Sequence, residues 1–301
     1  MSRRAVVASG RVDPALYGMH RATRVLLTVL TWLFALFVLG PLVWLLINAT
    51  KDQQHVYQSF GFWFAGPFRL FRNIASLGEN ISGAGVFLTW LKNTLIYALA
   101  GSIGATALSA LAGYGFARFR FRGSRALFFV VMASLLVPIT SVALPLFLVY
   151  AKTGLVNSIW GMILPSMVSV VGIYLMRTYI EASVPQDLIA AARIDGAGEW
   201  RIFSRIAMPL SAPGLLTVLL ITIVTIWNNY FLPLLIFSRS SKYPLTVGLA
   251  AMSAAAQTGT KPDLVPVLIT GGLITVVPVV FLFLLLERYF RGGLLQGSTT
   301  G

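Results

Sequence analysis

The sequence predicts an all-α integral membrane protein with six transmembrane helices and a short helical loop between spans four and five. Of its 301 residues, 57% are hydrophobic and only 11% are charged, whereas soluble domains carry about 25% charged residues. The mean hydropathy of +0.82 agrees with a membrane protein. Charged residues are also separated by apolar gaps of membrane length, since about 20 apolar residues cross a bilayer as a helix.

These gaps set the expected order of elements. We expect an N-terminal segment at residues 1–24, a six-span domain at 25–286 and a C-terminal tail at 287–301. The predicted spans lie at roughly 25–48, 93–116, 126–151, 157–177, 213–237 and 264–286. The stretch 243–260 is too polar and too short to count as a span. The first apolar run is longer than the core of a signal peptide, so we expect it to be retained as a helix.

The positions of the arginines predict the orientation. Placing the N-terminus in the cytoplasm puts most of the 23 basic residues on the cytoplasmic side, as is usual for loops near span ends. With six spans, both termini and the loop after span four are then cytoplasmic. The net charge of +14 therefore indicates topology and attraction to anionic lipid, and it requires no nucleic-acid partner.

Several classes of chemistry have no support in the sequence. There is no cysteine, which excludes disulfides and thiolate chemistry. The two histidines, His20 and His55, fall on opposite sides of the first span and form no local metal-binding cluster. No G-x-x-x-x-G-K-[ST] phosphate loop is present. We therefore expect a non-catalytic chain that binds no cofactor of its own.

The second span carries small residues at a spacing of four: Gly101, Ala105, Ser109 and Gly113. This spacing lines one helical face and lets a neighbouring backbone approach closely, although small residues can also simply fill a membrane helix. Prolines recur within the apolar runs and favour kinks. They are Pro41, Pro138, Pro145, Pro165, Pro233, Pro266 and Pro278.

The fifth span contains "WNNYFLP" at 227–233. Two amides in a bilayer need partners or a polar cavity. On a continuous helix Asn228 and Asn229 would point about 100° apart, so at most one would face a central pathway while the other bonds a neighbouring helix. Structural and pathway roles both remain open. Tyr230 is a further candidate pathway residue and could equally be a packing or interface aromatic.

The loop after span four has the pattern of two short helices. Pro185 suits a first helical turn, Asp187 places a carboxylate near the positive end of the helix dipole, and Gly196 ends the first helix. Leu188, Ala191, Ala192 and Ile194 are expected to supply contacts to a groove on another protein. A helix lying on the membrane surface is the open alternative.

Residues 184–213, "VPQDLIAAARIDGAGEWRIFSRIAMPLSAP", resemble the EAA loop of ABC importer permeases, in the version found in carbohydrate-uptake permeases of the maltose-transporter type. The resemblance extends over most of the chain after residue 90. It includes "LKNTLIYA" at 91–98, "GYGFARFRFRG" at 113–123, "WNNYFLPLLIF" at 227–237, "YPLTVGLA" at 243–250 and "ERYFRGGLLQG" at 287–297.

The resemblance implies a coupling loop at 181–212 that docks on a cytoplasmic ABC ATPase dimer, which would bind the ATP and Mg²⁺. It also implies a second, homologous permease subunit, an extracytoplasmic solute-binding protein, a sugar as the solute and a prokaryotic cytoplasmic membrane. The implied coupling residues are Asp187, Leu188, Ala190, Ala191, Ala192, Arg193, Ile194, Asp195 and Gly196. The family motif usually has Glu where this chain has Ala190, and Asp187, one turn earlier, could supply the missing carboxylate.

Two other classes of function remain open from the sequence. A self-contained secondary carrier or channel for a small polar solute would move its solute without ATP or other subunits. A membrane scaffold would use the loop to recruit a protein other than an ATPase. The apolar gaps from which the spans are drawn, of which the fourth ends at Met176, carry no Asp, Glu, Lys or Arg of the kind that coupled carriers often use.

Overall fold

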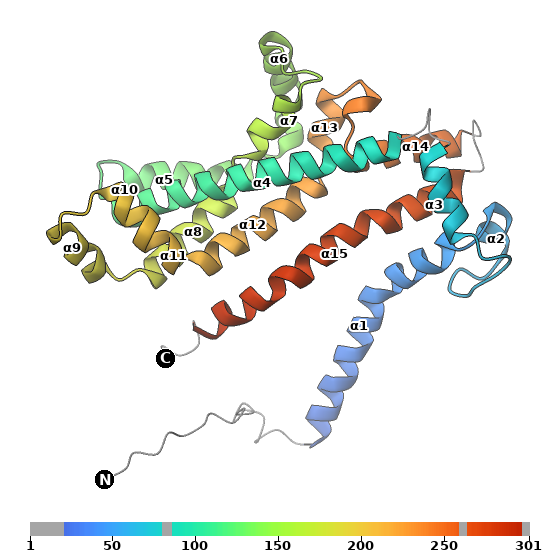
Figure 1. Cartoon of the computed structure of the whole chain (residues 1–301), viewed down its shortest axis with the longest axis horizontal. Coiled ribbons are helices and arrows are strands. Elements are labelled where there is room, and N and C mark those ends of the chain that lie inside the picture. Colours follow the sequence, from blue (N-terminus) through green and yellow to red (C-terminus); the bar gives the residue numbers. More distant parts are fainter. Residues whose placement is uncertain (1–20, 80–85, 259–263, 297–301) are drawn as a thin grey trace.

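The computed structural model describes residues 21–79, 86–258 and 264–296, and every regular element in these ranges is a helix (Figure 1). His20, the segment before it and residues 297–301 of the predicted tail lie outside the described residues.

Five helices are longer than the other described helices. They are α1 (Arg21–Ala49), α4 (Val86–Arg118), α8 (Val170–Ser183), α12 (Ala212–Trp227) and α15 (Leu264–Gln296). The central one is α4, which packs along α8, α12 and the shorter α7 (Ile159–Ser166). At the C-terminal end, α15 continues beyond the predicted span end at 286.

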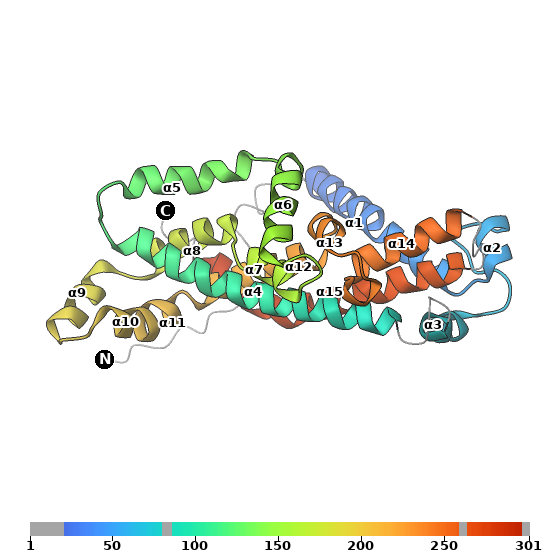
Figure 2. The same ribbon diagram turned by 90° about the horizontal axis from the view of Figure 1, so that it is seen from above.

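Two groups of short helices lie at opposite ends of the bundle around α4 (Figures 1 and 2). One end carries α2 (Gln53–Gln58), α3 (Leu70–Glu79) and α14 (Leu245–Gln257). The other end carries the loop after α8. It contains α9 (Gln186–Ile194), α10 (Glu199–Ile202), a π-helical turn (Phe203–Ala207) and α11 (Met208–Leu210).

Among the described residues, four helical segments are long and apolar enough to cross a membrane, and two bent pairs raise the number to six if each pair is one span. The predicted third span is one of these pairs. It consists of α5 (Ser124–Ala133), two 3₁₀ turns (Ser134–Leu136 and Ile139–Val142) and α6 (Ala143–Thr153), with a bend of 92°. The bend contains Pro138, which has an extended backbone and no N–H to continue a helix. This span is therefore not the single run that 126–151 suggests.

The small residues of α4 form a packing face, as predicted. All four are buried. A Cβ added at Gly113 would lie 2.8 Å from the backbone nitrogen of Arg177, and one added at Gly101 would lie 2.9 Å from Cβ of Ser166. These close approaches bring α7 and α8 against α4, because hydrogen is the only side chain that leaves room for them.

The start of α4 is fixed by hydrogen bonds to the loop before α14. Asn93 donates from Nδ2 to the carbonyls of Ser241 (2.9 Å) and Tyr243 (3.0 Å), and the Tyr97 hydroxyl donates to the Lys242 carbonyl at 3.0 Å. In return, the Thr94 hydroxyl accepts from the backbone N–H of Leu245 at 2.8 Å. The polar residues of "LKNTLIYA" therefore hold a turn 150 residues away in the sequence.

One helix stands apart from the rest. Figure 1 shows α1 diverging from the bundle, and its packing within the chain is mainly against α15. Its apolar side chains stay exposed, with Phe37 at 79%. A surface of this kind is expected to meet lipid or another membrane subunit.

Candidate functional sites

The loop between α8 and α12 is shaped by a glycine turn. Gly196 has a φ of +77°, a left-handed conformation that favours glycine. The N–H of Gly196 donates to the Arg193 carbonyl at 3.0 Å, and the N–H of Ala197 donates to the Ala192 carbonyl at 2.9 Å. This pair of bonds is a Schellman motif. It ends α9 at Ile194 and turns the chain back towards α10, as the sequence predicted for Gly196.

One face of the loop packs on the transmembrane helices. Ile189 of α9 and Ile202 of α10 are buried against Met176 and Ile180 of α8. Ala192 packs against the same cluster. It therefore lies towards the inner side of α9 and is half-buried, and its contact to a partner stays a prediction. Ile189 was not singled out from the sequence.

The opposite face of the loop is exposed and apolar. Ile194 is 87% exposed and Trp200 is 69% exposed, and Leu188 adds to this surface. Ala190 and Ala191 are exposed beside them. The carboxylate of Asp187 is exposed and has no hydrogen bond or ion pair within the part of the chain that the structure describes. Large apolar side chains that remain in solvent indicate a docking surface.

Polar contacts fix this loop to α4. Nη2 of Arg118 donates to the carbonyl of Ile180 at 2.6 Å and also to that of Val184, where α8 ends. The guanidinium thus meets the negative end of the α8 dipole. The Tyr114 hydroxyl donates to Oε2 of Glu199 at 3.4 Å. These residues belong to "GYGFARFRFRG", whose role could not be derived from the sequence because the contacts cross more than 60 residues.

Within the loop, Arg193 and Glu199 join the two short helices across the turn. Nε of Arg193 lies 2.7 Å from Oε1 of Glu199. The hydrogen bond to this carboxylate raises the pKa of the Arg193 guanidinium. Both side chains are nearly half exposed, so the pair orients the loop more than it stabilises the fold.

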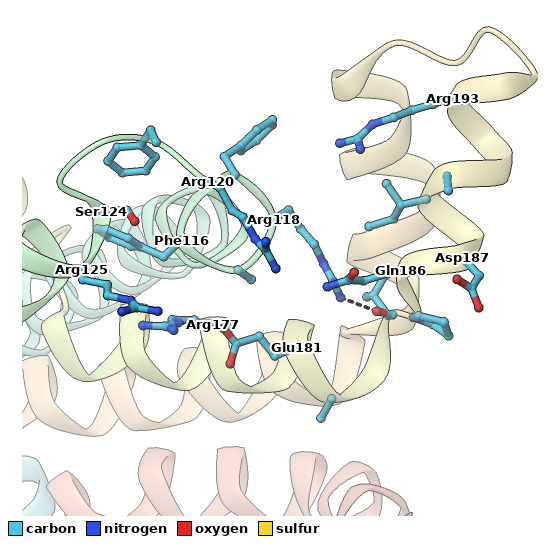
Figure 3. A pocket seen from close by; sticks show the side chains of 18 of the residues that line it. Phe116, Arg118, Arg120, Ser124, Arg125, Arg177, Glu181, Gln186, Asp187 and Arg193 are labelled. Atoms are coloured by element: carbon cyan, nitrogen blue, oxygen red, sulfur yellow. Dashed lines mark hydrogen bonds and ion pairs between the residues drawn. The ribbon is translucent and has the colours of Figure 1, made fainter.

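A cleft of about 1660 Å³ opens between this loop and the turn that joins α4 to α5. Figure 3 shows Arg118 and Arg120 on one side of it, with Arg125 and Arg177 close to each other on another. Glu181 and Asp187 are the acidic residues of its lining.

The second candidate site is an interruption between α12 and α13 (Phe231–Ile236). The sequence-based expectation placed Asn228 and Asn229 on a continuous helix, which is wrong here because α12 ends at Trp227. Nδ2 of Asn228 donates back to the Val224 carbonyl at 2.9 Å, and Oδ1 of Asn229 accepts from the N–H of Leu232 at 3.2 Å. Asparagine side chains compete in this way with the helical hydrogen bonds of the backbone.

The interruption is supported from α14 and open on one side. The Thr246 hydroxyl donates to the backbone carbonyl of Asn229 at 2.8 Å. Trp227 is buried, Asn229 is half-buried, and Asn228 and Tyr230 are exposed. Asn228 and Tyr230 are therefore free to meet a solute or a neighbouring subunit. No group of three or more His, Cys, Asp or Glu among the described residues could hold a metal ion.

Comparison with known proteins adds to this geometry. A family model described as "Binding-protein-dependent transport system inner membrane component" matches residues 105–294. The chain is 33% identical to the arabinooligosaccharides transport system permease protein AraQ of Halalkalibacterium halodurans, over 72% of this chain and 76% of the relative. It is 31% identical to the sn-glycerol-3-phosphate transport system permease protein UgpE of Yersinia pestis, over 87% of this chain and 92% of the relative.

A solved structure shares the fold. It is described as a bacterial ABC transporter involved in the import of the acidic polysaccharide alginate, and the matched chain is 23% identical with a TM-score of 0.74. The match covers 94% of this chain and 100% of the other.

Proposed function

Because this chain belongs to the family of binding-protein-dependent inner-membrane transport components, we propose that it forms one half of the translocation pathway of an ATP-driven sugar importer. Members of this family are permease subunits of ABC importers, non-catalytic proteins of the inner membrane. The finer proposal concerns topology: the chain crosses the cytoplasmic membrane of a prokaryote six times, with both termini and the α9–α11 loop in the cytoplasm.

The α9–α11 loop is the proposed coupling site, and its two-sided construction is the observation that carries this assignment. Ile189 and Ile202 fix its inner face to the membrane helices, while Leu188, Ile194 and Trp200 stay exposed on its outer face. A rigid element with an unpartnered apolar face can receive force from a bound protein and pass it to α8 and α4. The proposed contact residues are Asp187, Leu188, Ala190, Ala191, Ala192, Arg193, Ile194, Asp195 and Gly196, of which Ala192 is half-buried.

The proposed partner at this site is a cytoplasmic ABC ATPase dimer, which binds the ATP and Mg²⁺. An extracytoplasmic binding protein would deliver the solute, and a second, homologous permease subunit would complete the pathway. The exposed apolar surface of α1 supports a further membrane partner, since Phe37 and its neighbours remain largely exposed although α1 packs against α15.

We assign Asn228, Asn229 and Tyr230 to the pathway. At this helix break, Oδ1 of Asn228 and Nδ2 of Asn229 make no hydrogen bond within the described residues, so each amide keeps one group available for a solute. Amides both donate and accept hydrogen bonds, so they suit a hydroxyl-rich solute. The named relatives carry arabinooligosaccharides and sn-glycerol-3-phosphate, which share hydroxyl groups. A sugar or a related polyol or glycoside is therefore the proposed solute class.

Co-purification in mild detergent tests the coupling site with two proline variants. Gly196→Pro places proline at a φ of +77°, which its ring cannot adopt. The matched control is Gly198→Pro, because Gly198 already has a φ of −70° and its N–H donates no hydrogen bond within the described residues. We expect wild type and Gly198→Pro to retain an ABC ATPase and Gly196→Pro to lose most of it. Equal recovery with both variants would contradict the coupling assignment.

The same assay separates the alternative function. A correctly inserted wild-type chain that transports solute without any ATPase would establish a self-contained carrier instead. The variant Asp187→Ala adds a finer test. If Asp187 supplies the carboxylate that Ala190 lacks, its loss should weaken ATPase binding by at least about 10-fold, as expected for one charge-assisted hydrogen bond.

A further inference from the structure

The cleft beside α9 has a surplus of positive charge. Its lining includes the five arginines Arg118, Arg120, Arg125, Arg177 and Arg193, against two carboxylates. A cleft lined by one sign of charge concentrates ions of the opposite sign. The surplus therefore favours an anionic ligand.

Some of these arginines are already engaged within the protein. Arg193 pairs with Glu199, and Arg177 pairs with Glu181 at 2.9 Å while its guanidinium lies 4.3 Å from the centre of the Phe128 ring. The carboxylates of Glu181 and Glu199 are therefore already paired within the protein. The guanidinium of Arg118 is held by the end of α8, as described above.

The remaining two arginines have no such partner. Neither Arg120 nor Arg125 makes a hydrogen bond or ion pair within the described part of the chain, and both are exposed. Nε of Arg118 is buried and likewise lacks a hydrogen-bond partner among the described residues. Planar guanidinium groups with free N–H donors match phosphate oxygens in geometry and charge.

Beyond the cleft lining, the surface of α5 is apolar. This helix starts at Ser124 in the cleft lining and buries none of its residues. Phe129 and Val130 on it are 72% and 63% exposed. Figure 2 shows α5 lying along the side of the body, and it is the first half of the proposed third span. A ligand in the cleft therefore has free guanidinium groups at one end and an exposed apolar helix beside it.

This combination favours an amphiphile over a soluble anion. We propose that the cleft binds an anionic phospholipid, with its charged headgroup attracted by Arg120 and Arg125 of the lining and its acyl chains along the exposed surface of α5. Basic pockets between membrane helices on the cytoplasmic side are suited to such headgroups. The proposal rests on the proposed function only in one respect: the proposed topology places the cleft at the cytoplasmic leaflet of the membrane.

Native mass spectrometry of the full chain, in the assembly in which it purifies, tests the site with phosphatidylglycerol and phosphatidylcholine as probes. The first variant, Arg120→Gln with Arg125→Gln, removes both free arginines of the cleft. The matched control, Arg122→Gln with Arg205→Gln, removes two exposed arginines outside the cleft lining. Each variant changes the net charge by the same amount, and thermal unfolding checks that both are folded.

We expect wild type to bind phosphatidylglycerol in preference to phosphatidylcholine. The cleft variant should bind phosphatidylglycerol about 30-fold more weakly, because it lacks two arginines that each attract an anionic headgroup. The control variant should change by less than about 3-fold. Equal weakening of phosphatidylglycerol binding in both variants would overturn the proposed site, because the lipid would then be attracted by the overall positive charge and not by the cleft. Displacement of the lipid by inorganic phosphate at millimolar concentration would assign the cleft to a free anion instead.

A third result would also overturn the proposal. If the cleft variant loses the co-purifying ATPase and keeps its lipid, an acidic protein surface fills the cleft. Lipid retention and ATPase recovery are separate readouts, so failure of the lipid site can be told from failure of the coupling assignment.

Discussion

Arg118 offers the sharpest test of how the loop is held. Its guanidinium donates to the carbonyls of Ile180 and Val184, and these two residues are 0% and 1% exposed. In Arg118→Met both carbonyls therefore lose a charged donor. Each hydrogen bond to a charged group contributes about 1.5–3 kcal/mol, so the free energy that holds the loop against α4 should fall by about 3 kcal/mol or more.

A loss of this size raises the opening equilibrium of the loop by about 100-fold. Hydrogen exchange measured by mass spectrometry on peptides covering α9 reports that equilibrium directly. Arg122→Met is the control, because Arg122 lies four residues away, is exposed and has no hydrogen bond or ion pair in the described chain. Protection of α9 should fall by about 100-fold in the first variant only. Unchanged protection in Arg118→Met would show that the apolar contacts of Ile189 and Ile202 hold the loop without this residue.

Two further predictions concern other parts of the fold. Hydrogen bonds from the backbone and ring of His55 lower the pKa of Asp52. The ionised Asp52 carboxylate therefore stabilises the fold fully above the ordinary aspartate pKa of about 3.9. This stabilisation is lost as the pH falls through the lowered pKa of the folded protein. The difference in Tm between wild type and Asp52→Asn should therefore be full at neutral pH and shrink in acid; a difference that is independent of pH would contradict it. In α4, Gly113→Ala meets the backbone of Arg177, whereas Gly104→Ala meets the flexible side chain of Met167. Thermal unfolding should show Gly113→Ala costing about 1–3 kcal/mol and Gly104→Ala clearly less, and equal costs would refute rigid packing of α4 on α8.

The sequence could predict features that depend on local pattern. Small residues spaced by four in α4 predicted its packing face, and Gly196 predicted the turn after α9 because a left-handed residue is a local property. Two other features depend on contacts between distant segments. The anchoring role of Arg118 needs α8 beside it. The break at Asn228 and Asn229 also involves Thr246, which no pattern within "WNNYFLP" reveals.

The attachment of α4 at both ends has a mechanical consequence. Its first turns are tied to the loop before α14 through Asn93 and Tyr97, and its last turn is tied to the α8–α9 junction through Arg118. At 1.5 Å per residue, a helix of this length is a rod of about 50 Å. If such a rod pivots near one end by about 5°, simple trigonometry on that length moves its far end by about 4 Å. A small push on the loop at one end of the molecule would then be amplified, as by a lever, into a displacement at the opposite end.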